Sequence, residues 1–549
     1  MKWLIVLLAG TNLLPSSVFS AVTDNISTGN AKAEGMAYTV TANPPGIDSI
    51  FFNPAGLAKI KKRTAQINLI YALPDFAVDI GEHSQTLSDC LDGITCPKDV
   101  SDQVFYDEAE NTESSTSALA VMLPYFGGTK LDATLVPLGG VAVPLFKGVT
   151  FGTSVYSTVT AGYEREDDDP GRFFAQRLAL TRIAYFSPTI GIQLNDNWSV
   201  GIGISLSYFG IAVQMPMRLP NGATGIAGLL QDQLGCFDND NNTNLPLNLC
   251  GGALGPYTEL FDIDLESEET MSLTYQFGLL WDITPWLTWG MSYHSGVTDH
   301  LKGSADITYS DDWQGFFQGL SQSFSQARTG AEASSFLASL IPSGTHQQEN
   351  SDIVIDMNVP HYFATGFSLQ LTPTVRVNLD AKMSSWGDTE ALVINFENAD
   401  TELLTLLRTL DNILALDTAT SNSIRLPLYF EDTWSWSIGF EYNYSDILTL
   451  RMGYEDRRTS IPNDRQTILV PLSDMNVYAM GLSYKIDALS EVDFAISYYA
   501  PKEEHVAAGE SANSNSGTLN DIIYNPYAET DFTTKTSLFK MVLSYSFVF

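Results

Sequence analysis

The most reactive side chains of this sequence are four cysteines, which fall in two close pairs. Cys90 stands near Cys96, and Cys236 stands near Cys250. In an exported chain, pairs of this kind form disulfides, and the short spacing favours pairing within each pair. Other connectivities stay open. A zinc site is a weaker interpretation, because neither pair has the neighbouring histidines that would complete one.

The segment that follows Cys236 is rich in Asn and Asp, whose oxygen atoms are calcium ligands. Residues 237–244 nevertheless lack the glycine and the closing glutamate of an EF-hand loop. A solvated polar loop explains the same composition. We therefore predict no metal site.

The six histidines do not form a catalytic motif. An enzyme with a serine or cysteine nucleophile needs a base and an orienting acid within reach of it. His294 precedes Ser295, but such neighbours are common, and the other histidines stand apart from one another. We predict no enzymatic activity and no cofactor. A lipase or protease is the competing class of protein.

The elements that must carry these residues begin with an export signal. Lys2 precedes the apolar run 3–14, and small residues allow cleavage after Ser20, so residues 1–20 are a predicted signal peptide. A membrane helix would need about 20 apolar residues. Pro15 interrupts the run too early for that.

Composition narrows the class of the mature chain. The sequence has 549 residues, 44% of them hydrophobic, and contains no second apolar stretch long enough for a membrane helix. A net charge of −36 argues against nucleic acid or an anionic surface as a partner, and acidic loops facing the medium explain it. Aromatic residues make up 11% of the chain, which suits the interfacial girdles of a membrane barrel.

Several segments alternate large apolar side chains with small or polar ones. In the segment 198–208, every second residue from Trp198 to Tyr208 is large and apolar, and the residues between them are Ser or Gly. About ten residues with this period are typical of a strand that faces lipid on one side and a lumen on the other. The same pattern recurs in 434–443, 448–454, 478–484 and 539–549. The terminal Phe549 resembles the signal read by the outer-membrane assembly machinery, which we expect as a partner.

The connections between these segments alternate in length. Short turns occur at 147–148, 195–197, 284–285, 372–373, 444–446 and 487–491. Long polar stretches lie near 81–130, 164–171, 219–268, 309–349, 398–429, 457–473 and 502–533. This asymmetry distinguishes an outer-membrane barrel from a soluble β-sandwich or propeller. We predict an all-β fold: a transmembrane antiparallel barrel of about fourteen strands over residues 63–549, with short helices in its extracellular loops.

Residues 21–62 precede the first strand and carry a family resemblance. The motifs Ser27-Thr28-Gly29, Gly35-Met36-Ala37 and Asn53-Pro54-Ala55-Gly56-Leu57-Ala58 resemble the N-terminal hatch of the FadL/TodX family of outer-membrane transporters for hydrophobic compounds. The resemblance continues in order along the barrel. It includes Tyr293-His294-Ser295-Gly296, Val359-Pro360, Ser384-Ser385-Trp386, Leu450 to Asp456 and Ser460-Ile461-Pro462, whereas the loops near 81–130 and 219–268 do not match.

The resemblance implies a barrel in the outer membrane of a Gram-negative bacterium, plugged by a hatch over residues 21–62. Hydrophobic molecules such as long-chain fatty acids or hydrocarbons would diffuse from a surface groove into the lumen, and rearrangement of the hatch would let them leave sideways into the membrane. Asn53, Pro54 and Ala55 would hold and gate the hatch. The surrounding partners would be lipopolysaccharide and outer-membrane lipids, and we expect a monomer. A general porin for small polar solutes is the alternative, and it would have an open lumen.

The predicted outer loops contain apolar residues at helical spacing. Trp313, Phe316, Phe317, Leu320 and Phe324 share one helical face, and a leucine-rich run follows at 403–414. An apolar surface above the membrane would capture hydrophobic molecules from water. The alternative is that these helices pack on each other as a lid without touching ligand.

The charge of the cargo stays open. In fatty-acid members of the family, a basic lumen residue follows the equivalent of Tyr208, but here no basic residue appears before Arg218. Burying an unpaired carboxylate costs several kcal/mol, so this departure leaves room for neutral hydrocarbons or esters. Arg376, Lys382 and Arg451 are the lumen-facing residues that would replace the missing cation.

Overall fold

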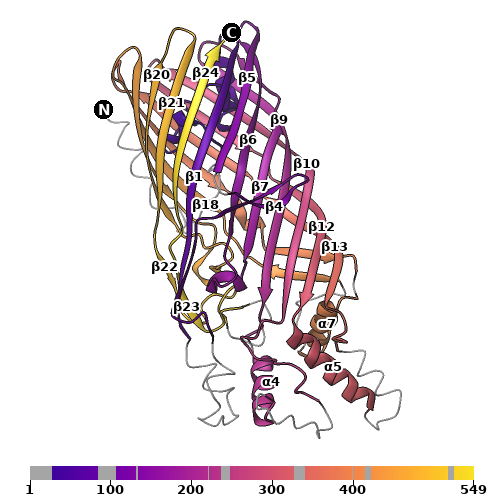
Figure 1. Cartoon of the computed structure of the whole chain (residues 1–549). Helices are drawn as coiled ribbons and strands as arrows, with labels where there is room; N and C mark the ends of the chain where they lie inside the picture. The colour runs from indigo at the N-terminus through magenta and orange to yellow at the C-terminus, as the bar shows by residue number, and fades with distance from the viewer. Residues whose placement is uncertain are drawn as a thin grey trace, which may run out of the picture.

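A computed structural model describes residues 28–83, 107–131, 134–220, 222–236, 248–326, 341–398, 400–414, 422–516 and 525–549. Their strands close into an antiparallel barrel, and helices gather at the end opposite the C-terminus (Figure 1). Among the described helices, none is long and apolar enough to cross a membrane. The predicted signal peptide, Cys90, Cys96 and the Asn-rich and Asp-rich segment after Cys236 lie outside the described residues.

The wall has fourteen strands, some of them interrupted, as the alternation predicts. Antiparallel pairing of the last strand with the first, for example Leu543 with Leu69, closes the barrel. In wall order the strands are β1 (Thr64–His83), β5 (Thr134–Phe146), β6 (Val149–Glu164), β7 (Arg177–Phe186) with β8 (Thr189–Gln193), β9 (Trp198–Met217), β10 (Phe261–Thr284), β11 (Leu287–His294) with β12 (Val297–Tyr309), β13 (Gln348–Val359) with β14 (Tyr362–Gln370), β15 (Val375–Ser384) with β16 (Ala391–Phe396), β17 (Ser423–Pro427) with β18 (Thr433–Asn443), β19 (Leu448–Arg457), β20 (Met475–Lys485), β21 (Ser490–Pro501) and β24 (Ser537–Val548).

Helices and short strands complete the barrel. Those of the N-terminal segment are α1 (Ala31–Glu34), η1 (Gly46–Asp48), α2 (Ser49–Phe52) and η2 (Pro54–Lys59), and those of the outer loops are η3 (Pro170–Phe173), α4 (Gly222–Gln233), α5 (Asp311–Gln326), α7 (Glu402–Leu414) and η5 (Asn463–Arg465). η4 (Trp386–Asp388) lies in the interruption between β15 and β16. The remaining strands are β2 (Thr112–Thr116), β3 (Leu119–Leu123), β4 (Gly127–Leu131), β22 (Glu504–Val506) and β23 (Thr530–Thr534).

The region 81–130 differs from the single long loop expected from the sequence. β2 pairs with the outer part of β1 and continues the wall, whereas β3 and β4 pair only with each other in a separate hairpin. These strands have only five residues each. Their alternation is too short to register as membrane strands of about ten residues.

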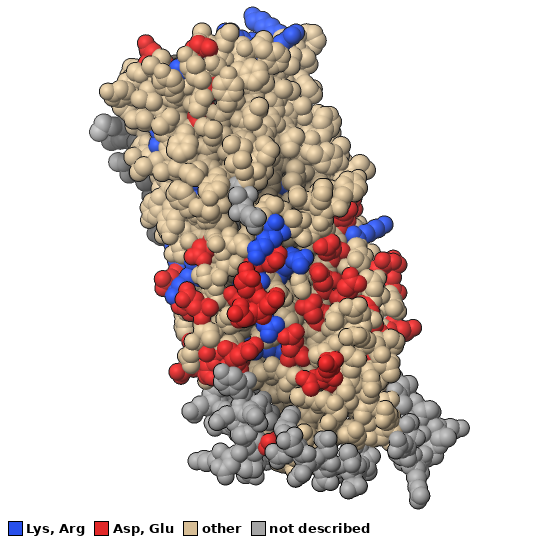
Figure 2. All heavy atoms as spheres, in the orientation of Figure 1, with Lys and Arg blue, Asp and Glu red and all other residues tan. Residues whose placement is uncertain are grey.

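The lipid-facing surface follows the predicted alternation. On β9, Ile202 and Ile204 are 61% and 50% exposed, whereas the alternate residues Gly203 and Ser205 face inward. The half of the surface nearer the C-terminus is almost free of charged side chains below its rim, and charges gather toward the helical end (Figure 2). The uncharged band marks the part of the wall that lies in the membrane. The short turns lie at the same end of the barrel as the C-terminus, and this end therefore faces the periplasm.

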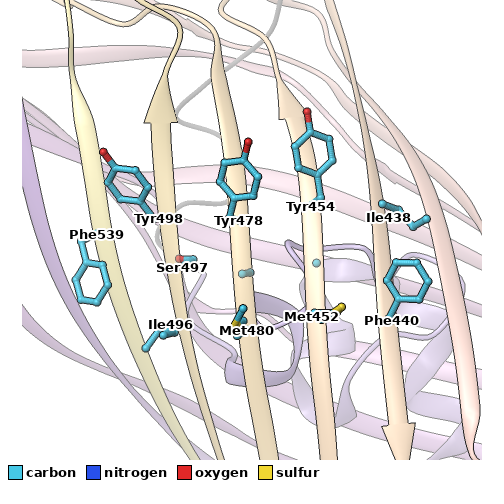
Figure 3. A pocket seen from close by; sticks show the side chains of 12 residues that line it. Ile438, Phe440, Met452, Tyr454, Tyr478, Met480, Ile496, Ser497, Tyr498 and Phe539 are labelled. Atoms are coloured by element: carbon cyan, nitrogen blue, oxygen red, sulfur yellow. The ribbon is translucent and has the colours of Figure 1, made fainter.

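One depression on this surface has a volume of about 350 Å³. Tyr454, Tyr478 and Tyr498 stand side by side on neighbouring strands, above Met452 and Met480 (Figure 3). All five project outward from the wall, since they share the face of the exposed alternating residues. The depression therefore faces lipid and is separate from the lumen.

The N-terminal segment lies inside the barrel on a seat of small residues. Gly201, Gly278 and Gly453 face inward, and a Cβ atom at any of them would overlap atoms of the segment at Pro54, Asn53 or Met36. The glycines and serines between the lipid-facing residues therefore have a packing role. They let the backbone of the plug approach the wall closely.

Candidate hydrophobic conduit

Helices α5 and α7 lie beyond the outer ends of β12 and β13 and pack on the apolar cluster inside the barrel (Figure 1). We call these two helices the roof. Trp313 of α5 is fully buried, its ring lies 5.0 Å from Tyr309 and 5.3 Å from Phe261, and Phe316 and Phe317 are buried beside it. Leu320 is partly buried against the same cluster, and the side chain of Phe324 lies outside the described part. The aromatic residues predicted to capture ligand are therefore packed against the interior cluster rather than exposed on the outer surface.

Glu402, the first residue of α7, holds the roof together. Its carboxylate accepts hydrogen bonds from Trp313 Nε1 at 3.0 Å and from the backbone amides of Gly344 and Thr345 at 3.1 Å each. Burial raises the pKa of the Glu402 carboxyl, but hydrogen bonds from Ser343, Trp313 and neighbouring groups outweigh burial and hold the pKa below its usual value. The roof is thus tied by an ionised carboxylate.

Below the roof, buried apolar side chains of several strands pack into one cluster inside the barrel. Ile263 and Leu265 of β10 face inward, while the alternate residues Asp262, Asp264 and Glu266 face outward. The cluster continues over neighbouring strands and includes Phe209, Ile211, Val213, Leu301, Ala305, Ile307, Ile353 and Ile355. We call the part of the barrel interior that these side chains fill the chamber.

The sequence of β10 contains a signal for the chamber that alternation within a single segment does not reveal. On β10, apolar side chains point inward at Ile263 and Leu265 but outward at Leu273 and Tyr275. The inversion occurs across a register shift between Glu269 and Ser272. A strand whose apolar side chains change from the outward to the inward face therefore indicates where the wall leaves the membrane and encloses an apolar interior.

A buried ion pair lies at the inner end of the chamber. Arg182 of β7 places Nη1 2.5 Å from Asp299 Oδ2 on β12, and its Nη2 donates to Ser272 Oγ at 2.6 Å. Both charged side chains are only 3% exposed, and the guanidinium lies 5.3 Å from the centre of the Phe209 ring. Arg182 is not among the lumen cations predicted from the sequence, because the family resemblance points to β9, whereas Arg182 is on the neighbouring strand β7.

The three predicted lumen contacts lie elsewhere. Arg376 and Arg451 both pair with Glu441, at 3.2 Å and 2.8 Å, near the short turn 444–446. Lys382 pairs with Glu455 at 3.2 Å and approaches the carbonyl of Ala37 in the plug. These cations meet carboxylates and the plug rather than the chamber.

Asn53 fixes the plug to the wall. Its Nδ2 donates to the carbonyl of Thr41 at 2.8 Å and to that of Leu279 on β10 at 3.1 Å, and its Oδ1 accepts from the amide of Ala55 at 3.2 Å. Pro54 follows as the first residue of η2 and rests on Gly201. One side chain thus joins two parts of the plug to a membrane strand.

An aromatic cluster joins the plug to the wall. The ring of Phe51 lies 4.8 Å from that of His294 and 5.1 Å from that of Tyr156. His294 Nε2 is 2.8 Å from the carbonyl oxygen of Phe51. His294 is therefore engaged by the backbone of the plug rather than by a serine nucleophile.

The deeper part of the plug is held by charge. Glu34 accepts a hydrogen bond from Lys540 Nζ at 2.7 Å, in a pair that is essentially unexposed. Asp48 accepts from Asn30 Nδ2 at 2.7 Å and from Asn68 Nδ2 of β1 at 3.0 Å. Since buried charges and amides need such partners, these contacts strongly specify how the plug sits.

The wall is interrupted beside the ion pair. β5 pairs with β6 only from Gly139 with Val155 to Phe146 with Val149. Residues 134–138 of β5 pair with β1 alone, and β6 has a bulge between Ser157 and Val159. The ladder between β5 and β6 therefore ends at Gly139 and Val155 and is open beyond them, a feature that could not be located from sequence.

The outer loops are tied covalently and by charge. The structure joins Cys236 to Cys250, with Cα atoms 4.9 Å apart. Arg218, which follows β9, donates to Asp107 at 2.9 Å and lies 4.2 Å from the centre of the Phe173 ring. Burial raises the pKa of the Asp107 carboxyl, but bonds from His83 and Arg218 outweigh burial and lower the pKa to about 2. Arg218 is therefore committed to loop packing.

A closed wall with a lipid-facing surface, an internal plug and a roof of loop helices defines a plugged outer-membrane β-barrel. A family model described as "Outer membrane protein transport protein (OMPP1/FadL/TodX)" matches residues 13–549, and the chain belongs to this family. It is an outer-membrane protein of the kind found in Gram-negative bacteria.

Individual relatives are distant. The chain is 20% identical over 321 residues to a "Long-chain fatty acid transport protein" of Escherichia coli, a match that spans 58% of this chain and 59% of the relative. Among solved structures, a FadL homologue of Pseudomonas aeruginosa has a TM-score of 0.65 at 17% identity, covering 97% of this chain and 100% of that one. The Pseudomonas putida toluene transporter TodX has a TM-score of 0.58 at 16% identity, covering 95% and 99%. These likenesses support the barrel fold.

Proposed function

We propose that this protein lets neutral hydrophobic compounds diffuse across the outer membrane. The observation that carries the proposal is the apolar chamber, which begins under the roof and ends at a neutralised ion pair. The free energy of an apolar molecule falls when it moves from water to such surroundings, because its apolar surface is removed from water. Relatives named for transport of long-chain fatty acids and of toluene support hydrophobic cargo in general.

The preference for neutral cargo follows from Arg182. Its guanidinium already faces Asp299, so a carboxylate arriving in the chamber would have to displace that partner. Breaking a buried ion pair leaves an uncompensated charge, which costs about 3–5 kcal/mol. Fatty acids are the second candidate cargo, because Arg182 is a cation at the base of the chamber.

The proposed path continues to the membrane. Cargo would enter past α5 and α7, cross the chamber and leave through the open ladder between β5 and β6, beside Ser157. Movement of the plug would widen this route, and such movement must break the contacts of Asn53. A ligand can drive this change only by binding the opened state more tightly.

The two competing classes make different predictions. A porin for polar solutes requires a water-filled lumen, whereas the plug here lies against the wall through backbone contacts at Gly201 and Gly453. Purified protein in planar bilayers is therefore expected to conduct little or no current. An enzyme would hydrolyse ester substrates, and we expect no esterase activity that the variant His294→Ala abolishes.

Uptake of labelled toluene and of a labelled long-chain fatty acid tests the proposal. Cells producing the protein should take up toluene faster than cells without it, and the fatty acid should gain less. Faster uptake of the fatty acid alone would favour the second candidate. Equal uptake with and without the protein would refute both.

A further inference from the structure

The hairpin of β3 and β4 lies on the outside of the barrel. It contacts the wall at Gly162 of β6, Thr181 of β7 and Gly210 of β9. Gly210 has the same alternation on β9 as the exposed residues Ile202 and Ile204, so it faces outward. In Figure 1 the hairpin crosses the near side of the wall in front of β7 and β9.

The wall carries a dedicated seat for this hairpin. A Cβ atom at Gly162 would overlap the carbonyl of Ala120, and one at Gly210 would overlap the side chain of Met122. Ala120 and Met122 also pack with the outward residues Ala179 and Ala212. Small residues at these four outward positions replace the large apolar residues found elsewhere on the lipid-facing wall. The amide of Met122 donates to Thr181 Oγ1 at 3.0 Å, which fixes the hairpin's position.

The turn of the hairpin presents two aromatic side chains that the protein does not cover. Tyr125 is 100% exposed and Phe126 is 79% exposed. The backbone of Tyr125 has a φ of 67°, an uncommon value for a residue other than glycine, and the following Gly127 is also left-handed. The turn therefore holds both rings away from the wall.

The turn lies where the outward side chains of the wall change from charged to apolar. The amide of Gly128 donates to Glu266 Oε1 of β10 at 2.8 Å. From Glu266 toward the periplasm, the outward side chains of β10 change from acids to the exposed Met271 and Leu273, which are 66% and 56% exposed. The aromatic turn thus lies at the boundary between the charged zone and the lipid-facing band.

We propose that the β3–β4 hairpin is an interfacial membrane anchor, with Tyr125 and Phe126 inserted among outer-leaflet lipids. Aromatic side chains favour this boundary because a ring can be buried in acyl chains while polar groups stay wet. Lipid is the occupant because the turn meets β10 at Glu266, on the extracellular side of the exposed Met271 and Leu273. The hairpin begins beside the open ladder, since the amide of Glu164 on β6 donates to the carbonyl of Ala118. An anchored hairpin would therefore hold the edge of that opening at a fixed depth.

Site-directed spin labelling measures this depth. A nitroxide would be attached to Phe126→Cys in full-length protein, reconstituted in vesicles of phosphatidylcholine and phosphatidylglycerol. Met480→Cys, at a lipid-facing position that is 61% exposed, gives the lipid reference, and Leu230→Cys of α4, at a position that is 44% exposed, gives the water reference. The parent chain, with its four cysteines, must take up no label.

The anchor predicts that collisions of the Phe126 label with oxygen, relative to a water-soluble nickel complex, are several-fold more frequent than at Leu230. A collision ratio equal to that at Leu230 would overturn the proposal, and would leave a protein partner or departing cargo as the use of the turn. Tyr125→Cys provides a second position if Phe126→Cys does not assemble. Because no cargo is present, failure here leaves the proposed transport function untouched.

Discussion

Replacing Asp299 by asparagine removes the carboxylate that neutralises Arg182, while the size of the side chain is kept. Arg182 would retain its bond to Ser272 but gain the capacity to bind an incoming carboxylate. A hydrogen bond to a charged group contributes about 1.5–3 kcal/mol. Since about 1.4 kcal/mol corresponds to a tenfold change in affinity, a fatty acid should bind roughly ten-fold to a hundred-fold more tightly relative to a neutral analogue.

The assay compares a long-chain fatty acid with the alcohol of equal chain length. Dissociation constants for both would be measured on purified parent protein and on the variant Asp299→Asn. The expected change is in the ratio of the two constants, because the alcohol has no charge to pair with Arg182. Glu441→Gln is a matched control, since Glu441 also bridges lumen arginines but lies near the periplasmic turn, away from the chamber.

Folding must be checked separately, because removing one partner of a buried ion pair destabilises a protein by about 3–5 kcal/mol. Retention of the heat-resistant barrel on gels is sufficient for that purpose. An unchanged ratio of dissociation constants in a folded Asp299→Asn variant would refute the role of the pair in selecting cargo. An equal change in Glu441→Gln would show that the effect is not local to the chamber.

Two further predictions concern the plug and the roof. Asn53→Ala leaves backbone groups of the plug and of β10 without their partner, which costs about 1–3 kcal/mol for each group that stays buried and unsatisfied. Uptake of labelled toluene should fall in a variant that still assembles. Undiminished uptake would remove the plug from the mechanism. The depressed pKa of Glu402 means that its ionised form stabilises the roof above the ordinary value of 4.5, and that this stability is lost as the pH falls through the lower folded-state pKa. The difference in Tm between the parent and Glu402→Gln should therefore be largest at neutral pH and shrink in acid, and a difference independent of pH would contradict the assignment.

The membrane-facing wall was predictable from sequence because its signal is local. Each strand carries its own alternation, so the outward positions of Ile202, Trp436 and Met480 follow from period 2 alone. Short turns such as 195–197 and 444–446 separate strands as expected. The plug was found for a different reason, since its Asn-Pro-Ala motif matches a family pattern.

The chamber and its ion pair were not predictable, because their geometry depends on barrel register. Arg182 and Asp299 are separated by 117 residues, and only the closed sheet brings them together. The burial of Trp313 likewise depends on how α5 meets the wall, which helical spacing does not encode. The external course of the β3–β4 hairpin is set by small residues on three other strands, and none of them is unusual in its own strand.

The central claim is that a neutral hydrophobic molecule crosses the outer membrane through this protein. The most direct measurement is the initial rate of labelled toluene uptake at low external concentration, compared between cells that produce the parent protein and cells that produce a variant with a closed β5–β6 opening. In this variant, Leu138→Cys and Tyr156→Cys form an engineered disulfide next to the last paired residues of the two strands. We expect fast uptake by the parent, slow uptake by the oxidised variant and recovery after reduction. Uptake by the oxidised variant at the parental rate would contradict the proposed path.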